Sequence, residues 1–356
     1  MTGGGTGGHV YPALSVAQAL RRQAPDTQIL FAGTRRGDVE RLAREAGLPF
    51  VLVDAAPLRG RGPLAVVRAL GRLAAGTLRA RRLVARVRPD VVFATGGYAS
   101  VPVSLAARWR RVPLVLYLPD VYPGWAVRLL ARLSQRIALS GDAALAHLPR
   151  ERATVTGYPV RDRFLTITRS EARATLGMPA NERLLLVTGA SQGAHAINAA
   201  VFACLERLLS GCLVLHQTGV ADLPEAQARS RALPEALRER YRPLAYLDDM
   251  AAAMVAADLV VMRAGASALA EPPAAGLPAI LVPGSFSDQR HNAGYMAAQG
   301  AALVLAEAHL DRLAETVCAL LQDSGRLARM AEAARRLAHP DAAGAIARLV
   351  VEAAVA

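Results

Sequence analysis

The stretch LLLVTGASQGAHAIN, residues 184–198, contains the parts of an α/β unit in one run. Leu184–Thr188 is a continuous apolar and β-branched segment of strand length, and the glycine turn Gly189–Ala194 follows it directly. The alanine-containing residues after the turn favour a helix. Where a glycine turn leads into a helix, free backbone N–H groups and the helix dipole can hold a phosphate or a developing anion. The stretch therefore predicts an anion-binding turn.

Two more glycine-rich turns occur in the first hundred residues. Gly4–His9, GGTGGH, opens a helical stretch, and Thr95–Tyr98, TGGY, ends the strand-like run Val91–Thr95. Neither Thr95–Tyr98 nor Gly189–Ala194 matches the dinucleotide fingerprint G-x-G-x-x-G with an acidic residue about 20 positions later. Glycine turns at the heads of two α/β domains predict a ligand in a cleft between those domains.

The first turn lacks the strand that should lead into it, because only Met1 and Thr2 precede the glycines. We expect this strand upstream of the numbered sequence, with about six to ten residues, the length of an ordinary strand. An upstream coding sequence without an apolar β-type run would contradict this expectation.

Strand-like runs alternate with alanine-rich amphipathic stretches along almost the whole chain, which is typical of α/β folds with parallel sheets. At about 150 residues per domain, 356 residues predict two domains. The expected strands are Gln28–Ala32, Phe50–Val53, Val91–Thr95, Leu114–Leu118, Arg136–Leu139, Leu184–Thr188, Leu213–Gln217, Leu244–Leu247, Leu259–Met262 and Ala279–Val282.

The polar, poorly periodic segment Arg161–Ser170 is the best candidate for the linker between the domains. The residues from Leu310 onward indicate consecutive helices with a break at Pro340. We expect domains at residues 1–163 and 164–340, followed by a helix at 341–356 that packs back on the first domain.

All 42 basic side chains are arginine, since the sequence contains no lysine. Chemistry that needs a lysine amine is excluded, such as the Walker-A phosphate loop, the protein-kinase strand lysine and the pyridoxal or aldolase Schiff base. The charge is unevenly distributed. Residues 1–165 contain 25 arginines and 10 acidic residues, net +15, whereas the remainder contains 17 and 19, net −2.

The surplus positive charge is densest between Asp54 and Asp90, where nine arginines occur without an acidic residue. Leucine and valine interleave with them at roughly helical spacing, which favours a basic helix that docks on an anionic lipid surface. A solvated helix in an arginine-rich protein is the alternative. We do not expect nucleic acid as a partner, since the segment has no aromatic residues to stack on bases.

The three cysteines, Cys204, Cys212 and Cys318, are widely spaced and form no C-x-x-C motif. Their odd number argues against a disulfide framework or a cysteine zinc site, and we expect three buried small apolar residues. No apolar run approaches the length of about 18 residues that a membrane span needs.

Eight sequence motifs, which follow one another along nearly the whole chain, resemble those of a known family. They are GGTGGHVYPALSVAQAL, LRGRG, GGYASVP, GYPVR, GASQGAHAIN, YLDDM, RAGASALAE with AAGLPAILVP, and DQRHNA. This set resembles the MurG family of peptidoglycan N-acetylglucosaminyltransferases. The resemblance implies a GT-B fold, in which two Rossmann-like α/β domains with parallel sheets face each other across a cleft, with the acceptor and membrane domain at residues 1–163 and the UDP-GlcNAc domain at 164–340.

The same resemblance implies an activity. Family members transfer GlcNAc, with inversion, from UDP-GlcNAc to the C4 hydroxyl of the MurNAc of lipid I, forming lipid II at the cytoplasmic face of the cell membrane. No D-x-D motif occurs in this sequence, which agrees with a metal-independent mechanism without a cofactor.

The resemblance also implies a donor site. Glu271 matches the glutamate that accepts hydrogen bonds from the two ribose hydroxyls, Ser191 the loop at the diphosphate, and Leu247 the residue whose backbone faces uracil. Asp288 replaces the first glutamine of the family's usual pair. The other residues expected around UDP-GlcNAc are Thr6, Gly7, Gly8, Asp120, Arg161, Gln192, Met250, Arg263, Gly265, Ala266, Gln289 and Asn292, of which Arg263 equally fits a structural interdomain charge.

Two residues are candidates for acid/base catalysis. His9 begins a helix after a glycine turn, and an imidazole that is mostly neutral at pH 7 can take a proton from the acceptor hydroxyl. A histidine that caps the helix or contacts phosphate is the alternative. The family's H-E-x-N string reads Tyr117–Asp120 here, YLPD, so the glutamate is absent and Asp120 stands at the asparagine position. We expect His9 and Asp120 to share the acid/base work.

The acceptor diphosphate and the membrane are expected to meet other residues of the first domain. The diphosphate candidates are Gly5, Gly8, Gly96, Gly97 and Tyr98. The candidates for contact with anionic lipid are Arg68, Arg72, Arg79, Arg81, Arg82 and Trp109.

Three other functions fit the sequence. A related lipid glycosyltransferase would keep the donor half and use another acceptor. A UDP-GlcNAc 2-epimerase would need a cluster of catalytic carboxylates in the cleft. A catalytically silent nucleotide-sugar-binding protein at the membrane surface is the third, since the family's glutamate is absent.

Overall fold

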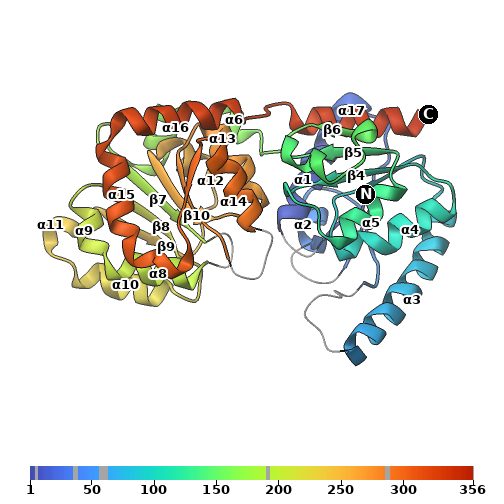
Figure 1. The fold of residues 1–356 in the computed structure, drawn as a ribbon, viewed down its shortest axis with the longest axis horizontal. Coiled ribbons are helices and arrows are strands. Elements are labelled where there is room, and N and C mark those ends of the chain that lie inside the picture. Colours follow the sequence, from blue (N-terminus) through green and yellow to red (C-terminus); the bar gives the residue numbers. More distant parts are fainter. Residues whose placement is uncertain (5–6, 35–38, 56–62, 190–192, 285–288, 356) are drawn as a thin grey trace. The chain divides into compact units, whose positions relative to one another are not determined.

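The computed structural model describes residues 1–4, 7–34, 39–55, 63–189, 193–284 and 289–355 (Figure 1). These residues form two compact units, which we call the first and the second unit. The first unit comprises Met1–Val160 and the segment from Asp341 onward, and the second comprises Arg161–Pro340. Among the helices so described, none is long and apolar enough to cross a membrane.

The first unit is built on parallel strands. Leu114–Leu118 is buried along its whole length, as expected for a strand whose two faces are both covered. In sheet order the strands are β3 (Val92–Ala94), β4 (Leu114–Leu118), β5 (Arg136–Leu139) and β6 (Ala153–Val155), and the separate pair is β1 (Phe31–Gly33) with β2 (Phe50–Leu52).

Thr2 connects these two groups of strands. It forms parallel bridges to Ala32 in β1 and to Ala94 at the end of β3. Its N–H donates to the Phe93 carbonyl (2.8 Å), and the Ala32 N–H donates to the Met1 carbonyl (2.8 Å). The two residues before the first glycine turn therefore lie in strand positions, and the upstream strand stays a prediction.

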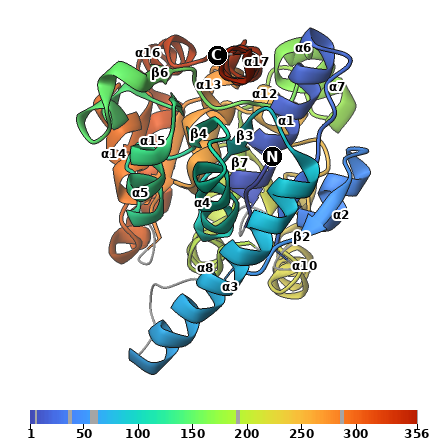
Figure 2. The same cartoon turned by 90° about the vertical axis from the view of Figure 1, so that its right-hand side faces the viewer.

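Helices of the first unit pack around this sheet. The helix α17 lies against α1, and Gln23 Nε2 donates a hydrogen bond to the Gly344 carbonyl (3.2 Å). The helix α3 packs against α4 and extends beyond the strands of its unit (Figure 2). The helices are α1 (Gly7–Gln23), α2 (Val39–Glu45), α3 (Pro63–Val87), α4 (Val101–Trp109), α5 (Trp125–Leu133) and α17 (Ala342–Val355), with 3-10 turns η1 (Tyr98–Ser100), η2 (Asp142–Ala146) and η3 (Arg150–Arg152).

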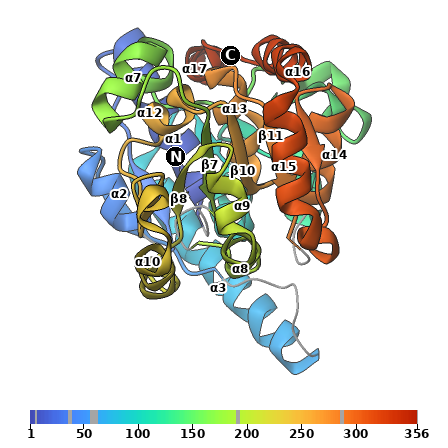
Figure 3. The same ribbon diagram turned by 90° about the vertical axis from the view of Figure 1, so that its left-hand side faces the viewer.

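The second unit has a six-stranded parallel sheet with helices on both faces (Figure 3). In sheet order the strands are β12 (Ala302–Val304), β11 (Ala279–Val282), β10 (Leu259–Arg263), β7 (Leu184–Thr188), β8 (Leu213–Gln217) and β9 (Tyr241–Leu244). The helices are α6 (Arg163–Thr166), α7 (Arg169–Leu176), α8 (His195–Ala203), α9 (Leu205–Leu209), α10 (Leu223–Ala232), α11 (Glu235–Arg238), α12 (Met250–Ala256), α13 (Glu271–Ala275), α14 (Gln289–Ala298), α15 (Leu313–Gln322) and α16 (Ser324–Arg336), with 3-10 turns η4 (Ala266–Leu269) and η5 (Glu307–Arg312).

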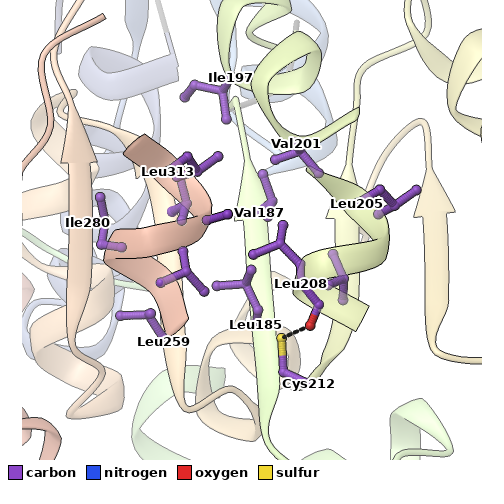
Figure 4. Close-up of a cluster of buried hydrophobic side chains, with 14 of the residues drawn as sticks. Leu185, Val187, Ile197, Val201, Leu205, Leu208, Cys212, Leu259, Ile280 and Leu313 are labelled. Atoms are coloured by element: carbon purple, nitrogen blue, oxygen red, sulfur yellow. Dashed lines mark hydrogen bonds between the residues drawn. The ribbon is translucent and has the colours of Figure 1, made fainter. Parts of the chain in front are cut away.

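The core of the second unit lies between the sheet and helices α8, α9 and α15 (Figure 4). Leu185 and Val187 alternate along β7 and point to this face, where they meet Ile197 and Leu313. This packing accounts for the apolar run 184–188, which lies at the centre of the sheet.

Only one of the three cysteines is fully buried, so the prediction for the other two was wrong. Cys212 is buried, and its thiol donates to the Leu208 carbonyl (3.3 Å), whereas Cys204 and Cys318 are half-buried. Burial raises the pKa of Cys204 to about 11 and that of Cys212 to about 12, so both thiols stay protonated at pH 7.

Most predicted strands are confirmed, but four features differ. The strand expected at Gln28–Ala32 lies at Phe31–Gly33. The strand expected at Leu244–Leu247 lies at Tyr241–Leu244, and Pro243 fits there because β9 is an edge strand. The strands β6 and β12 have only three residues each and were not predicted. The candidate linker Arg161–Ser170 contains α6 and the start of α7, which begins with a capping box between Thr168 and Glu171.

We predict that Leu185→Ala lowers the free energy of unfolding of the second unit by about 2–5 kcal/mol, because it leaves a cavity among fully buried neighbours. Urea denaturation measures the change. The matched control is Leu165→Ala on α6, where the side chain is 46% exposed, with an expected loss of at most about 0.5 kcal/mol. Equal losses in the two variants would contradict the packing described.

Candidate active site

In the first unit, the glycine turn after β3 has a backbone that only glycine adopts readily. Gly96 and Gly97 have φ angles of 79° and 74°, in the left-handed region. The hydroxyl of Ser100 lies 2.9 Å from the carbonyl oxygens of both glycines and holds the turn closed. The turn leads through η1, which starts at Tyr98, into α4.

His9 lies in the first turn of α1 and is half-buried. Its Nδ1 is 2.7 Å from the carbonyl oxygen of Thr95, the residue just beyond β3. Because a carbonyl oxygen only accepts hydrogen bonds, Nδ1 must carry the proton, and in the neutral ring Nε2 keeps its lone pair. The structure thus orients His9 so that Nε2 is the basic nitrogen, with no hydrogen bond to it from the described residues.

The imidazole of His9 lies against the second glycine turn. A Cβ atom at Gly97 would be 3.7 Å from His9 Nε2 and 3.0 Å from the Gly4 carbonyl oxygen. Two of the glycine turns found in the sequence therefore meet at His9. The start of α1 is also held by Tyr158, whose buried hydroxyl donates to the Gly8 carbonyl (3.4 Å).

Asp120 lies two residues beyond the end of β4 and is half-buried. Since β3 and β4 are neighbouring parallel strands, Asp120 and the Gly96–Gly97 turn are on the same carboxyl edge of the sheet. Burial, together with the charges of Tyr158 and Asp120, raises the pKa of Tyr117 well above its usual value, and Tyr117 bonds to Ser140 beneath this edge (2.7 Å).

In the second unit, the turn after β7 also requires its glycines. Gly193 has a φ of 78°, and a Cβ atom there would collide with the Thr218 carbonyl. A Cβ atom at Gly189 would collide with the Ala194 backbone. Four predicted site residues, Gly5, Thr6, Ser191 and Gln192, lie outside the described residues. Asp288 also lies outside them.

Glu271 is the first residue of α13, and its side chain is 20% exposed. The guanidinium of Arg161 lies 3.6 Å from Glu271 Oε1. Burial raises the pKa of Glu271, while Arg161 and a hydrogen bond with Ser267 act in the opposite direction. A Cβ atom at Gly265, in the turn before Ala266, would meet nothing within 4 Å, so this side of the site is open.

Leu247, expected to face uracil, and Met250, expected around UDP-GlcNAc, lie at the start of α12. Leu247 is buried, and Met250, the first residue of α12, is half-buried. Asp249 between them caps the helix by accepting from the Ala252 N–H (3.0 Å), and Arg163 lies 3.1 Å from its other oxygen. The backbone at this position is thus fixed by a cap and an ion pair.

Three further predicted donor residues have partners within the second unit. Arg263 forms an ion pair with Glu307 (2.6 Å), which is in the same unit and so does not make Arg263 an interdomain charge. Gln289 Oε1 accepts from the Gly284 N–H (2.8 Å). Asn292 is fully buried and donates to the Ala264 carbonyl (3.1 Å), so it joins α14 to the end of β10.

The arginines expected at the membrane lie on α3, next to Trp109 on α4. Arg72, Arg79 and Arg82 are exposed, and Arg79 pairs with Asp54. The guanidinium of Arg81 lies 4.2 Å from the ring centroid of Trp109, whose side chain is 56% exposed. An apolar cavity of about 410 Å³ adjoins Trp109, lined by Leu73, Ala74, Thr77, Leu78 and Leu105. The side chain of Arg68 lies outside the described part.

Sequence reasoning missed the partners that orient the site. The Thr95 carbonyl and the Tyr158 hydroxyl hold His9 and the start of α1. Thr95 lies in the turn TGGY and Tyr158 in the motif GYPVR. Neither string shows which backbone carbonyl will pair with a side chain, because that depends on the tertiary fold.

Residues 1–139 match the glycosyltransferase family 28 N-terminal domain, and residues 184–346 match the glycosyltransferase family 28 C-terminal domain. The chain is 40% identical to the UDP-N-acetylglucosamine--N-acetylmuramyl-(pentapeptide) pyrophosphoryl-undecaprenol N-acetylglucosamine transferase of Roseiflexus sp. (strain RS-1), covering 98% of this chain and 93% of the relative. It is 42% identical to the enzyme of the same name from Salinibacter ruber (strain DSM 13855 / M31), covering 99% and 95%.

The solved structures agree with the sequence comparisons. The crystal structure of Acinetobacter baumannii MurG superimposes with a TM-score of 0.80 at 27% identity, covering 99% of this chain and 98% of that one. A UDP-GlcNAc 2-epimerase from Neisseria meningitidis has a TM-score of 0.66 at 14% identity, a likeness of fold alone. The chain therefore belongs to the MurG family, within glycosyltransferase family 28, and has the GT-B-type fold of two α/β domains.

Proposed function

We propose that the protein transfers GlcNAc from UDP-GlcNAc to the C4 hydroxyl of the MurNAc of lipid I, with inversion, and so forms lipid II and UDP in peptidoglycan synthesis. The observation that carries this proposal is the similarity, over 98% or more of the chain, to enzymes named for this transfer. The orientation of His9 in the first unit supplies the base that the transfer needs.

In this mechanism, His9 Nε2 takes the proton of the acceptor hydroxyl as the oxygen forms its bond to C1 of GlcNAc. The bond from C1 to the diphosphate breaks on the opposite side, and UDP leaves with the electron pair. The Thr95 carbonyl holds Nδ1–H and stabilises the imidazolium that results. Asp120, at the same edge of the sheet, is the carboxylate that shares this acid/base work.

The donor is held by the second unit. Glu271 accepts hydrogen bonds from the two ribose hydroxyls, and Arg161 lies beside it. The backbone of Leu247 faces the uracil, and Met250 lies near it at the start of α12. The start of α8, after Gly193 and Ala194, is proposed to meet the diphosphate, where the N–H groups of a helix N-terminus stabilise the charge that develops on the leaving group. Gly265, Ala266 and Gln289 border the sugar, and Asn292 supports them from within the fold.

The first unit also provides the contact with the membrane. Exposed Trp109, with Arg81 stacked on it, and the adjoining apolar cavity form an apolar surface with a cation beside it, and α3 carries further exposed arginines. Such a surface fits a peripheral protein at an anionic leaflet, which for lipid I as acceptor is the cytoplasmic face of the cell membrane. Lipid I and anionic lipids are thus the proposed partners besides UDP-GlcNAc.

We predict that His9→Ala lowers kcat for lipid II formation from UDP-GlcNAc and lipid I by about 10²–10⁴-fold, the range for loss of a general base. Asp120→Asn is expected to lower kcat by about tenfold if the two groups share the work. Radiolabelled GlcNAc incorporation measures both.

The control is His309→Ala, an exposed histidine of η5, which should retain full activity. Full turnover of Asp120→Asn would make Asp120 a ligand only. Consumption of UDP-GlcNAc without lipid II would point to another acceptor, and binding of UDP-GlcNAc without turnover would point to a silent protein.

We predict that replacing Arg72, Arg79 and Arg82 by glutamine weakens binding to anionic vesicles at low salt, because each arginine near the surface contributes about 1 kcal/mol. Wild-type binding should fall as salt rises, since the attraction is screened. Vesicle co-sedimentation with phosphatidylglycerol and with phosphatidylcholine alone measures both effects. The control replaces Arg207, Arg326 and Arg329, which are exposed in the second unit. Equal binding of the wild type to both vesicles would contradict the proposed contact.

A further inference from the structure

A chain of hydrogen bonds runs through the second unit behind the turn that ends at Gly193. Its centre is His216 on β8, which is fully buried. His216 Nδ1 lies 3.0 Å from the hydroxyl of Tyr241 on β9, and His216 Nε2 lies 3.0 Å from Asn198 Oδ1 on α8. No step of the proposed reaction uses these groups.

The direction of each hydrogen bond in this chain is fixed. Asn198 Nδ2 donates to the Thr218 carbonyl (2.7 Å) and to Asp222 Oδ2 (2.7 Å), so Asn198 Oδ1 must accept from His216 Nε2–H. Burial lowers the pKa of His216 to about 3, so the ring is neutral, and its Nδ1 accepts from the Tyr241 hydroxyl. The chain therefore runs in one direction from Tyr241 to Asp222.

Asp222 ends the chain next to the start of α8. It also meets His195, the first residue of α8, whose Nδ1 lies 3.0 Å from Asp222 Oδ1. Burial raises the pKa of Asp222, but hydrogen bonds from Asn198 and His195 outweigh it and hold the pKa below its usual value. Asp222 is thus ionised and receives hydrogen bonds from two residues one helical turn apart.

The chain is in direct contact with the glycine turn. The Thr218 carbonyl that Asn198 holds is the group that a Cβ atom at Gly193 would strike. Thr218 thus packs directly against the backbone of Gly193, and the Asn198 N–H donates to the Ala194 carbonyl just before α8 (2.9 Å). The Gly193 backbone and the start of α8 are the groups that the proposed function aims at the donor diphosphate.

We propose that Asp222 is a positioning residue for the diphosphate of a bound nucleoside diphosphate, acting through Asn198, His195 and the Gly193 backbone. The inference rests on the proposed donor site of the second unit and adds a residue that supports it from behind. Asp222 should therefore affect the affinity for the phosphate groups of the ligand and leave the affinity for the nucleoside unchanged.

Electrostatic repulsion alone predicts the opposite change in UDP affinity. An aspartate near a diphosphate repels it, so Asp222→Asn should tighten UDP binding if charge were the only effect. An amide at this position can accept from Asn198 through its oxygen, but its N–H₂ group pairs with His195 Nδ1 only if the ring proton moves to Nε2. The charge-assisted hydrogen bonds of the carboxylate are then replaced by weaker neutral ones. Positioning therefore predicts weaker UDP binding despite the removal of a negative charge.

The experiment compares UDP and uridine binding by calorimetry in the full-length protein. For Asp222→Asn we expect UDP affinity to fall about tenfold while uridine affinity stays within about twofold, because only the phosphate contacts depend on the turn. Tyr241→Phe removes the first donor of the chain without a charge change, and should weaken UDP binding about threefold with the same selectivity. Asp311→Asn, an exposed aspartate on η5, is the matched control and should change neither affinity.

Steady-state kinetics adds a second readout, in which both variants raise KM for UDP-GlcNAc more than they lower kcat. Tighter or unchanged UDP binding in Asp222→Asn would overturn the inference, as would equal losses for UDP and uridine. If Asp222→Asn does not fold, unchanged UDP binding by Tyr241→Phe overturns it, and a selective loss supports it. A wild-type protein that binds neither UDP nor uridine would instead overturn the donor site itself.

Discussion

The hydrogen bond from His9 Nδ1 to the Thr95 carbonyl is the contact on which the site of the first unit depends. It ties the start of α1 to the end of β3 and decides which nitrogen of the imidazole carries the proton. Gly97 has a left-handed φ of 74°, and a Cβ atom there would be only 3.0 Å from the Gly4 carbonyl oxygen. This backbone conformation and close approach favour glycine in the turn beside His9, and Ser100 and Tyr158 hold the backbone around the ring.

In the second unit, side chains hold the backbone of the corresponding glycine turn. Its turn after β7 also lies against a carbonyl just beyond a strand, Thr218 after β8, and Asn198 fixes that carbonyl. The buried chain from Tyr241 to Asp222 keeps Asn198 in one orientation. In each unit, a strand, a glycine turn and a helix place backbone groups at the carboxyl edge of a parallel sheet, where ligands of α/β folds bind.

Much of this organisation follows from local sequence, because a buried parallel strand such as Leu184–Thr188 is apolar throughout and a left-handed turn such as Gly96–Gly97 needs glycine. The strands β6 and β12 were not predicted; both are short edge strands that are only partly buried. The resemblance identified Glu271 and His9 as site residues, but their partners depend on tertiary contacts. The pairing of Arg263 with Glu307 and the burial of Asn292 could not be read from the motifs that contain them.

The ¹⁵N chemical shifts of the His9 ring measure most directly whether the contact with Thr95 leaves Nε2 as the basic nitrogen. In protein with ¹⁵N-labelled histidine, assigned by comparison with His9→Gln, we expect the neutral ring to carry its proton on Nδ1 and to have an unprotonated Nε2. A neutral form with the proton on Nε2, or rapid exchange between the two tautomers, would contradict the account.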